Sequence, residues 1–104
     1  MTIRQFDVYP TPLRASREER PYVMVMQSSV IDSQSRVCAP LVAERFIRPD
    51  GRLNPRFEIE GRNFYLHPVE LITLAVRVLR IPVANLEHER YHIISAIDLV
   101  FTGV

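Results

Sequence analysis

The residues His88-Glu89-Arg90-Tyr91-His92 satisfy the pattern H-E-x-x-H. On a helix this spacing sets two imidazoles on one face, where they bind zinc, and the glutamate acts as a general base. A catalytic zinc site needs a third protein ligand, and the only other histidine, His67, precedes Pro68 in a separate segment. The chain is also small for a metalloprotease, and the charged neighbours of His88 and His92 predict a solvated helix face. A zinc-dependent hydrolase that uses His88, Glu89 and His92 is therefore a disfavoured hypothesis.

Other catalytic patterns are weaker still. The chain has three glycines and no glycine-rich nucleotide motif, so no nucleotide cofactor is expected. Glu58 and Glu60 fall on one face of an expected strand, where a solvated pair is favoured over an acid/base dyad. Cys38 is the only cysteine, which excludes a disulfide within the chain, and we expect it to be a small buried hydrophobe. We expect a protein that is not an enzyme and that binds no cofactor and no metal.

Size and composition are typical of one globular domain, spanning residues 1–104, with 47% apolar and 24% charged residues. The formal net charge of +1 gives no electrostatic reason to expect sequence-independent binding to nucleic acid. The lone cysteine suits a reducing compartment, and neither a signal peptide nor a long apolar run is present. We therefore expect a cytoplasmic protein that has no membrane partner.

A hydrophobic period of two predicts short strands through most of the chain. They are expected at 6–8, at 22–26, at 37–41, in a hairpin at 57–60 and 63–66, and at 74–78. Both alternating sets at 22–26 are apolar, which predicts a strand covered on two faces. Pro40 lacks an N–H group and predicts that the 37–41 strand lies at a sheet edge or a bulge. Turn-forming and charged residues predict loops over 10–21 and over most of 44–55.

After Pro82 the period changes to about 3.6, which predicts a C-terminal helix. Its apolar residues fall on one side, and Asn85 is the expected cap at its start. The residues of that side are Leu86, Ile93, Ile94, Ile97 and Phe101. The expected fold class is mainly β, a small antiparallel domain closed by an α-helix.

Two segments have the composition of contact sites. The last nine residues carry an apolar helical pattern into Gly103-Val104, whereas chain ends normally bear little apolar surface. This ending is expected to dock on the chain's own core, on a second copy or on a target. The serine-rich segment 27–36 contains the apolar pair Val30-Ile31, which either marks a contact site or plugs the mouth of a barrel.

Together these segments resemble the CcdB family, the toxins of bacterial toxin–antitoxin pairs. The matching pieces are Val23-Met24-Val25-Met26 running into Gln27-Ser28-Ser29-Val30-Ile31-Asp32-Ser33, then Pro40-Leu41-Val42-Ala43, then the ungapped end from Val83-Ala84-Asn85-Leu86 through His88 to Ala96-Ile97-Asp98-Leu99-Val100-Phe101-Thr102-Gly103-Val104. The resemblance spans nearly the whole chain and is loose between Glu44 and Phe64.

The resemblance implies a small SH3-like antiparallel β-barrel with a C-terminal α-helix, which forms a homodimer. Proteins of this family bind the DNA gyrase A subunit and trap its DNA-cleaved state without breaking a bond themselves. A CcdA-like antitoxin removes the toxin from gyrase, and the complex of the two represses its own operon. The resemblance therefore implies contact with DNA only indirectly, through the antitoxin.

The resemblance also assigns a gyrase-binding set, consisting of Ser28, Val30, Asp98, Thr102, Gly103 and Val104. Phe101 is expected to be buried in the fold, with the last three residues presented to the partner. The family has a tryptophan where this chain has Thr102, and an asparagine where it has Asp98. Because loss of a buried aromatic anchor costs an interface several kcal/mol, an alternative stays open. In that alternative the chain keeps the CcdB fold but no longer poisons gyrase, and it acts only by binding the antitoxin or on a different target.

Overall fold

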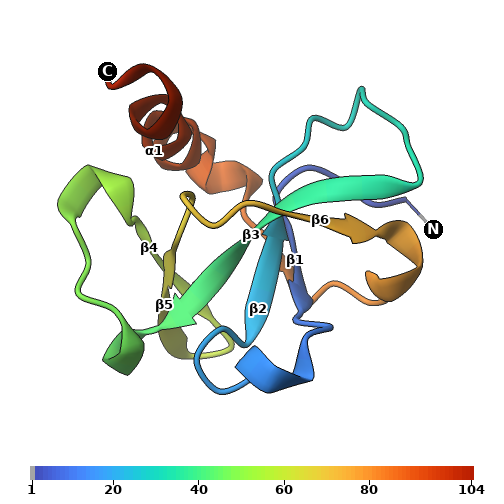
Figure 1. The fold of residues 1–104 in the computed structure, drawn as a ribbon, viewed down its shortest axis with the longest axis horizontal. Helices are drawn as coiled ribbons and strands as arrows, with labels where there is room; N and C mark the ends of the chain where they lie inside the picture. Colours follow the sequence, from blue (N-terminus) through green and yellow to red (C-terminus); the bar gives the residue numbers. More distant parts are fainter. Residues whose placement is uncertain (1) are drawn as a thin grey trace.

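The computed structural model describes residues 2–104, which form seven strands and one α-helix joined by short 3-10 turns (Figure 1). The strands are β1 (Asp7–Pro10), β2 (Tyr22–Val25), β3 (Ser35–Ala43), β4 (Arg56–Ile59), β5 (Arg62–Leu66), β6 (Ile72–Ala75) and β7 (Ala84–Asn85). The helix is α1 (Arg90–Thr102). The expected loops over 10–21 and 44–55 hold only 3-10 turns, at Arg14–Ser16, Glu44–Phe46 and Gly51–Leu53.

All strand pairs are antiparallel, in the order β4-β5-β3-β2-β1-β7, and β6 pairs with β3. The long strand β3 serves two partners, because its first half pairs with β6 and its last three residues pair with β5. The sheet thereby bends into a nearly closed barrel, and α1 packs against it at the C-terminal end of the chain (Figure 1). The expected class, a small antiparallel β-barrel with a C-terminal helix, is confirmed.

Strand β2 separates two hydrophobic clusters. Met24 faces the larger one, inside the barrel, together with residues of β1, β3, β4, β5 and α1. Val23 and Val25 face the smaller one, which also contains Cys38 and Leu74. The strand is therefore covered on both faces, as its two apolar sets predict. Each fully buried apolar side chain of this size stabilises the fold by about 1.5–3 kcal/mol.

The predicted hairpin forms, but its turn is Glu60-Gly61 and not the expected Gly61-Arg62, so Glu60 lies in the turn and not in the strand beside Glu58. Ile59 pairs with Arg62, so only Glu60 and Gly61 connect β4 to β5. Both residues have positive φ angles, 52° and 80°. A two-residue turn of this kind matches the right-handed twist of the strands, and glycine adopts such an angle without a steric cost.

The predicted edge position of Pro40 is wrong, because Pro40 pairs with Val23 inside the sheet. In a strand, the nitrogen and the carbonyl of one residue point to the same side. The Pro40 carbonyl accepts a hydrogen bond from the His67 N–H at 3.0 Å, at the place where β3 changes partner from β6 to β5. The Pro40 nitrogen, which has no hydrogen to donate, therefore points to the gap between β6 and β5. No backbone hydrogen bond between strands is lost there.

Two element boundaries also differ from the sequence prediction. The strand expected at 74–78 ends at Ala75, and the 3-10 turn Val76–Val78 follows it. The C-terminal helix begins at Arg90, whereas Asn85, its expected cap, lies in β7 and pairs with Asp7. The Asn85 side-chain oxygen accepts a hydrogen bond at 2.9 Å from the N–H of Glu87, the first residue of the 3-10 turn Glu87–Glu89, whose N-cap residue is Leu86. The side-chain amide of Asn85 also donates a hydrogen bond to the Asp7 carboxylate at 2.9 Å, which helps to hold Asn85 at the edge of β1.

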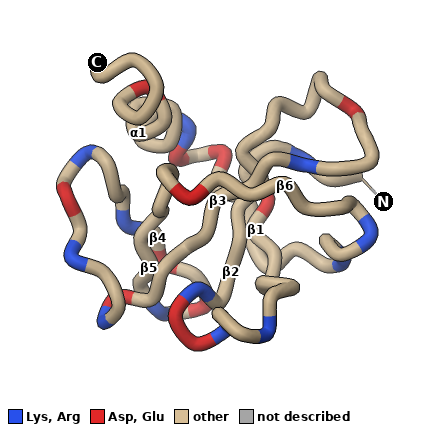
Figure 2. The backbone as a smooth tube through the Cα atoms, viewed as in Figure 1, with Lys and Arg blue, Asp and Glu red and all other residues tan. Residues whose placement is uncertain are grey.

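Charges of both signs alternate along the loops, and no large region of one sign stands out in Figure 2. No helix within residues 2–104 combines the length and the apolar character needed to cross a membrane.

Candidate functional site

The helix end is shaped by Gly103. Its φ of 76° and ψ of 9° are left-handed, and its N–H donates to the Leu99 carbonyl at 3.2 Å. This is the αL form of a helix end, in which a glycine satisfies one of the last free carbonyls. Val104 therefore leaves the helix axis, with 78% of its surface exposed.

Thr102 has its hydroxyl engaged within the helix. The hydroxyl donates to the Asp98 carbonyl one turn earlier at 2.7 Å and accepts a hydrogen bond from the Val104 N–H at 3.4 Å. Asp98 itself is exposed near the negative end of the helix dipole, and the last turn has no basic residue to offset its charge. The end of α1 is therefore anionic.

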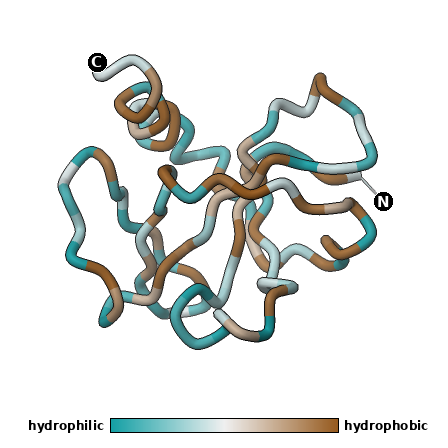
Figure 3. Tube along the Cα trace, viewed as in Figure 1, coloured by the Kyte–Doolittle hydropathy of each residue, from teal (hydrophilic) through white to brown (hydrophobic). Residues whose placement is uncertain are grey.

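The predicted burial of Phe101 is wrong, because 68% of its surface is exposed. Ile93 and Ala96 are the buried residues of α1, and Ile93 packs in the barrel cluster, whereas Phe101 in the last turn has no such cover. Phe101 and Val104 therefore form an apolar surface that no residue of the described chain covers. Figure 3 shows hydrophobic stretches in α1 and at the tip of the loop formed by residues 27–34.

The 27–34 loop presents a second apolar surface. Val30 is 87% exposed and Ile31 is 56% exposed, so this pair does not plug the barrel. The Ser28 hydroxyl accepts a hydrogen bond from the Val30 N–H at 3.2 Å, and the Ser28 carbonyl accepts one from the Ile31 N–H at 3.0 Å. These two bonds form a tight turn that holds the apolar pair in solvent.

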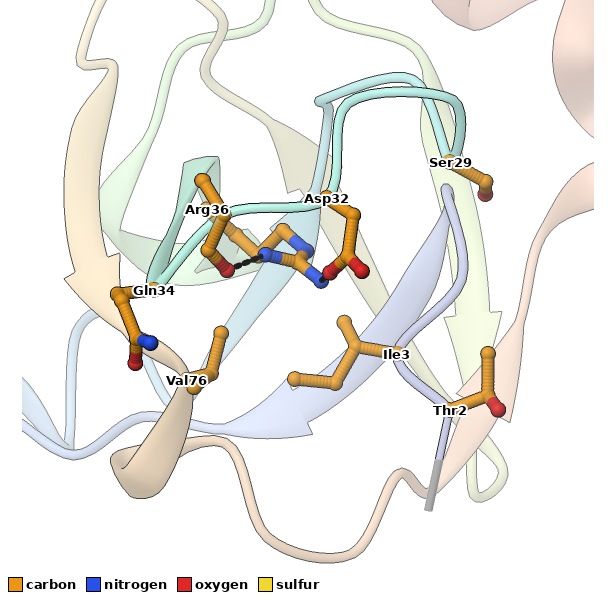
Figure 4. Close-up of a pocket in the computed structure, with 8 residues that line it drawn as sticks. Thr2, Ile3, Ser29, Asp32, Gln34, Arg36 and Val76 are labelled. Carbon is orange, nitrogen blue, oxygen red and sulfur yellow. Dashed lines mark hydrogen bonds and ion pairs between the residues drawn. The ribbon is translucent and has the colours of Figure 1, made fainter.

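Arg36 anchors the base of this loop from a hollow of about 790 Å³ (Figure 4). Only 8% of the arginine is exposed, and its guanidinium donates to the carbonyls of Ser33 and Ser35. It also pairs with the Asp32 carboxylate at 3.4 Å. Because these contacts join the loop to the first residues of β3, Arg36 fixes the direction in which the loop leaves the sheet.

The six predicted site residues do not share one pocket. Ser28 and Val30 line a hollow of about 340 Å³, whereas Asp98 lines another of about 680 Å³. Thr102, Gly103 and Val104 lie on the open surface. In Figure 1 the helix end and the 27–34 loop rise on the same side of the molecule and lie apart from each other.

Arg90 lines both hollows and joins the two groups. Its guanidinium donates to Glu87 and to the side-chain oxygen of Gln5, each at 3.0 Å, and lies 5.1 Å from the centre of the Phe6 ring. The Gln5 N–H in turn donates to the Ser29 hydroxyl at 2.9 Å. This chain of contacts connects the start of α1 to the loop. Sequence reasoning missed Arg90, because its partner Gln5 lies 85 positions away.

The H-E-x-x-H residues do not adopt the geometry of a zinc helix. His88 lies in the 3-10 turn before α1, whereas His92 lies within the helix. The two histidines line different hollows, and Glu89 pairs with His92 at 3.0 Å. Within residues 2–104, no three His, Cys, Asp or Glu residues come together as a metal-binding group.

Cys38 is buried, as predicted. Burial raises the pKa of its thiol to about 12, and the nearby Arg36 guanidinium opposes that shift. The thiol is therefore protonated at neutral pH, whereas a nucleophilic cysteine reacts as the thiolate.

Comparison with known proteins adds the family. The sequence model described as "CcdB protein" matches residues 5–103, which is nearly the whole chain. No curated protein matches the chain. The matched range includes every strand of the barrel, the 27–34 loop and all of α1. Because the match extends well beyond half of the chain, the protein belongs to the CcdB family of toxin–antitoxin toxins.

Proposed function

We propose that this protein is a toxin that binds the DNA gyrase A subunit and traps the enzyme's DNA-cleaved state. The observation that carries this proposal is the pair of uncovered apolar surfaces, one at Val30 on the 27–34 loop and one at the Phe101–Val104 end. Exposed apolar residues on an anchored loop and a capped helix end are suited to a protein interface. The residues proposed to touch gyrase are Ser28, Val30, Asp98, Thr102, Gly103 and Val104.

Trapping needs no chemistry from the toxin. A ligand that binds one state of an enzyme more tightly than the other shifts the population toward that state. A preference of about 1.4 kcal/mol is worth tenfold in that equilibrium. Contacts made only with the cleaved state of gyrase therefore suffice to prolong it.

The proposal includes the family's assembly. Two copies form a homodimer, and a CcdA-like antitoxin binds that dimer, neutralises it and carries it to DNA. The toxin acts in the cytoplasm, where gyrase works.

A second candidate function rests on Thr102 and Asp98. The hydroxyl of Thr102 is used inside the helix, and the Asp98 carboxylate adds negative charge to the same surface. Both features differ from the tryptophan and asparagine of the family. In this candidate the protein keeps the fold and the antitoxin but no longer poisons gyrase, or it acts on another target.

A gyrase-dependent DNA-cleavage assay tests the first function against the second. We expect purified wild-type protein to raise the amount of cleaved DNA, and the antitoxin to reverse the effect. Thr102→Trp adds the aromatic anchor, and Thr102→Val is the matched control that removes the hydroxyl alone. If only Thr102→Trp traps cleaved DNA, the second candidate holds and the first fails.

Growth provides an independent measurement. Expression of the chain alone is expected to arrest growth, and co-expression with the gene directly upstream is expected to restore it. Arg80→Ala changes an exposed arginine outside the proposed surface and is expected to behave as wild type. Growth arrest without cleaved DNA would contradict gyrase as the target.

A further inference from the structure

A turn formed by residues 4–7 lies between the 27–34 loop and the start of α1, and we call it the 4–7 turn. The Phe6 N–H donates to the Val25 carbonyl at 2.7 Å, close to the entry of the loop. The Phe6 carbonyl accepts a hydrogen bond from the Leu86 N–H at 3.0 Å, shortly before the helix. One residue of the turn therefore contacts both the end of β2 and the approach to α1.

Gln5 makes parallel contacts in both directions. Its Nε2 donates to the Met26 carbonyl at 3.0 Å, and its backbone N–H donates to the Ser29 hydroxyl at 2.9 Å. On the helix side, the Gln5 carbonyl accepts from the Asn85 amide at 3.1 Å, and its side-chain oxygen accepts from Arg90. The position of Gln5 therefore decides how the loop stands relative to the start of the helix.

The 4–7 turn holds Phe6 in a strained conformation. Its φ of 70° lies in the left-handed region, which a bulky side chain rarely adopts. The ring is fully buried in the barrel cluster, so the turn cannot relax without removing the ring from the core. Strained residues persist only where the surrounding structure over-determines them, and they gather at functional sites. Another group must therefore hold this turn closed.

The buried carboxylate of Asp7 closes the turn. Its Oδ2 accepts a hydrogen bond from the Arg4 N–H at 2.9 Å, while the Asp7 N–H donates to the Arg4 carbonyl at 3.1 Å. Oδ2 also accepts from the Tyr9 hydroxyl at 3.4 Å, and Oδ1 accepts from the Asn85 amide at 2.9 Å. Only 4% of Asp7 is exposed, and within residues 2–104 no cation pairs with it. Three hydrogen-bond donors therefore stabilise this carboxylate in place of a counter-ion.

Donors approach both oxygens of Asp7, so a carboxylate satisfies all of them and an amide does not. An asparagine would turn its NH₂ group either toward the Arg4 N–H or toward the Asn85 amide, and two donors would then face each other. The Asn85 amide is fixed in its orientation, because its oxygen accepts from the Glu87 N–H at 2.9 Å. Burial and then the Asp7 charge raise the pKa of Tyr9 to about 12, so the hydroxyl keeps its proton and donates to Asp7.

We propose that Asp7 is a positioning residue for the proposed gyrase-binding surface. It holds the 4–7 turn closed, and the turn sets the 27–34 loop at a fixed place relative to α1. Because Asp7 is buried, it acts through Gln5 and Phe6 and does not touch the target itself. The inference rests on the proposed function for its effect on gyrase, whereas the placement of the loop is tested without gyrase.

Hydrogen exchange measured by NMR tests the placement of the loop. The reporters are the backbone N–H groups of Gln5 and Ile31, which lie in the turn and in the loop. Asp7→Asn is expected to speed exchange at both about tenfold or more, through local opening. Ile59→Ala is the matched control, because it removes a fully buried side chain at the hairpin end of the barrel and leaves the turn unchanged. Equal acceleration by both variants would show that Asp7 contributes only to stability, and the inference would fail.

Ser29→Ala breaks the same set of contacts at an exposed position, where the fold is not at risk. It is expected to speed exchange of the Gln5 N–H about fivefold or more, since that group loses its acceptor. Ser33→Ala removes another exposed hydroxyl of the same loop, one that bonds to the Ser35 carbonyl and not to the turn. If Ser33→Ala accelerates exchange as much as Ser29→Ala, the 4–7 turn does not hold the loop.

Gyrase-dependent DNA cleavage relates the placement of the loop to function. The toxin concentration for half-maximal cleavage is expected to rise about fivefold for Asp7→Asn and for Ser29→Ala, and little further in the double variant, because both changes break one set of contacts. Asp50→Asn removes the charge of an exposed aspartate elsewhere and is expected to leave cleavage unchanged. Effects that multiply in the double variant would show two independent roles and overturn the inference.

The two measurements separate this inference from the proposed function. If Asp7→Asn speeds loop exchange but wild-type protein traps no cleaved DNA, the proposed function fails and the placement of the loop by Asp7 holds. If Asp7→Asn changes neither loop exchange nor cleavage, the inference fails, while trapping of cleaved DNA by wild-type protein still supports the proposed function.

Discussion

Apolar residues near the start and at the end of the C-terminal segment 90–104 have opposite environments. Ile93 and Ala96, in the first half, are buried, and Ile93 packs in the barrel cluster that contains Met24. Phe101 and Val104, at the other end, are mostly exposed. The helix is about 20 Å long at 1.5 Å per residue, and its buried residues, Ile93 and Ala96, lie in the part that precedes its last turn. Hydrophobic residues favour burial against some surface. The position of the barrel decides which of them are buried within this chain and which remain free to contact another molecule.

This comparison predicts that stability resides in the first half and binding in the second. Four substitutions test it.

Ile93→Ala is expected to have the largest effect. It removes a fully buried side chain from the barrel cluster, which costs the transfer free energy and leaves a cavity. We expect the free energy of unfolding to fall by about 2–5 kcal/mol, measured by urea denaturation. A loss below about 1 kcal/mol would show that α1 is not held by its first half.

Gly103→Ala is expected to cost about 1 kcal/mol, because alanine resists the left-handed φ of 76° at the helix end. A Cβ at this position meets no atom within 4 Å, so the effect is purely conformational. Gly103→Asn is the matched control and is expected to lose less, since asparagine tolerates this conformation. Equal losses for both variants in urea denaturation would point to a lost packing contact instead.

Asp98→Asn is expected to stabilise the fold by about 0.5 kcal/mol, because it removes a negative charge near the negative end of the helix dipole. The gain should shrink when salt is raised, since the carboxylate is exposed. Thermal unfolding at low and high salt measures it. A destabilised variant would reveal an attractive contact of Asp98 and break the comparison.

Phe101→Ser is expected to have the smallest effect on stability, within about 0.5 kcal/mol, because the side chain is mostly exposed. Under the proposed function the same variant lowers gyrase-dependent DNA cleavage, because Phe101 adds apolar surface directly before the proposed contacts Thr102 and Val104, whereas Ile93→Ala keeps it wherever the protein remains folded. Urea denaturation beside the cleavage assay gives both values. A stability loss as large as that of Ile93→Ala would erase the distinction between the two halves.

Local patterns predicted the parts of the fold that local forces decide. The hairpin around Gly61 and its alternating strands required only neighbouring residues, although the turn lies one residue earlier than expected. The strand at 22–26 carried apolar residues on both faces and is covered on both. The exposure of Val30 and Ile31 was one of two alternatives, and composition alone did not separate them.

The errors arose where a distant segment competes for a residue. Asn85 has a side chain typical of a helix cap, but it pairs with Asp7 at the edge of β1. The helix therefore begins only at Arg90. Pro40 was expected at an edge or a bulge because it lacks an N–H, whereas it lies inside the sheet, at the place where β3 exchanges β6 for β5. Phe101 fits the apolar side of the helix, but no strand reaches it.

The sequence by itself determined that the chain is mainly β with a C-terminal helix, and its motifs resemble one toxin family. These properties follow from the hydrophobic period, the turn residues and the motif residues. Each of these features is contained in a short stretch of sequence and can be recognised without knowing the fold. Only the tertiary structure decided which apolar residues remain uncovered, and that Arg90 joins the helix to the 27–34 loop. The physical reason is that burial and long-range hydrogen bonds depend on where the barrel ends in space, and no short segment contains that information.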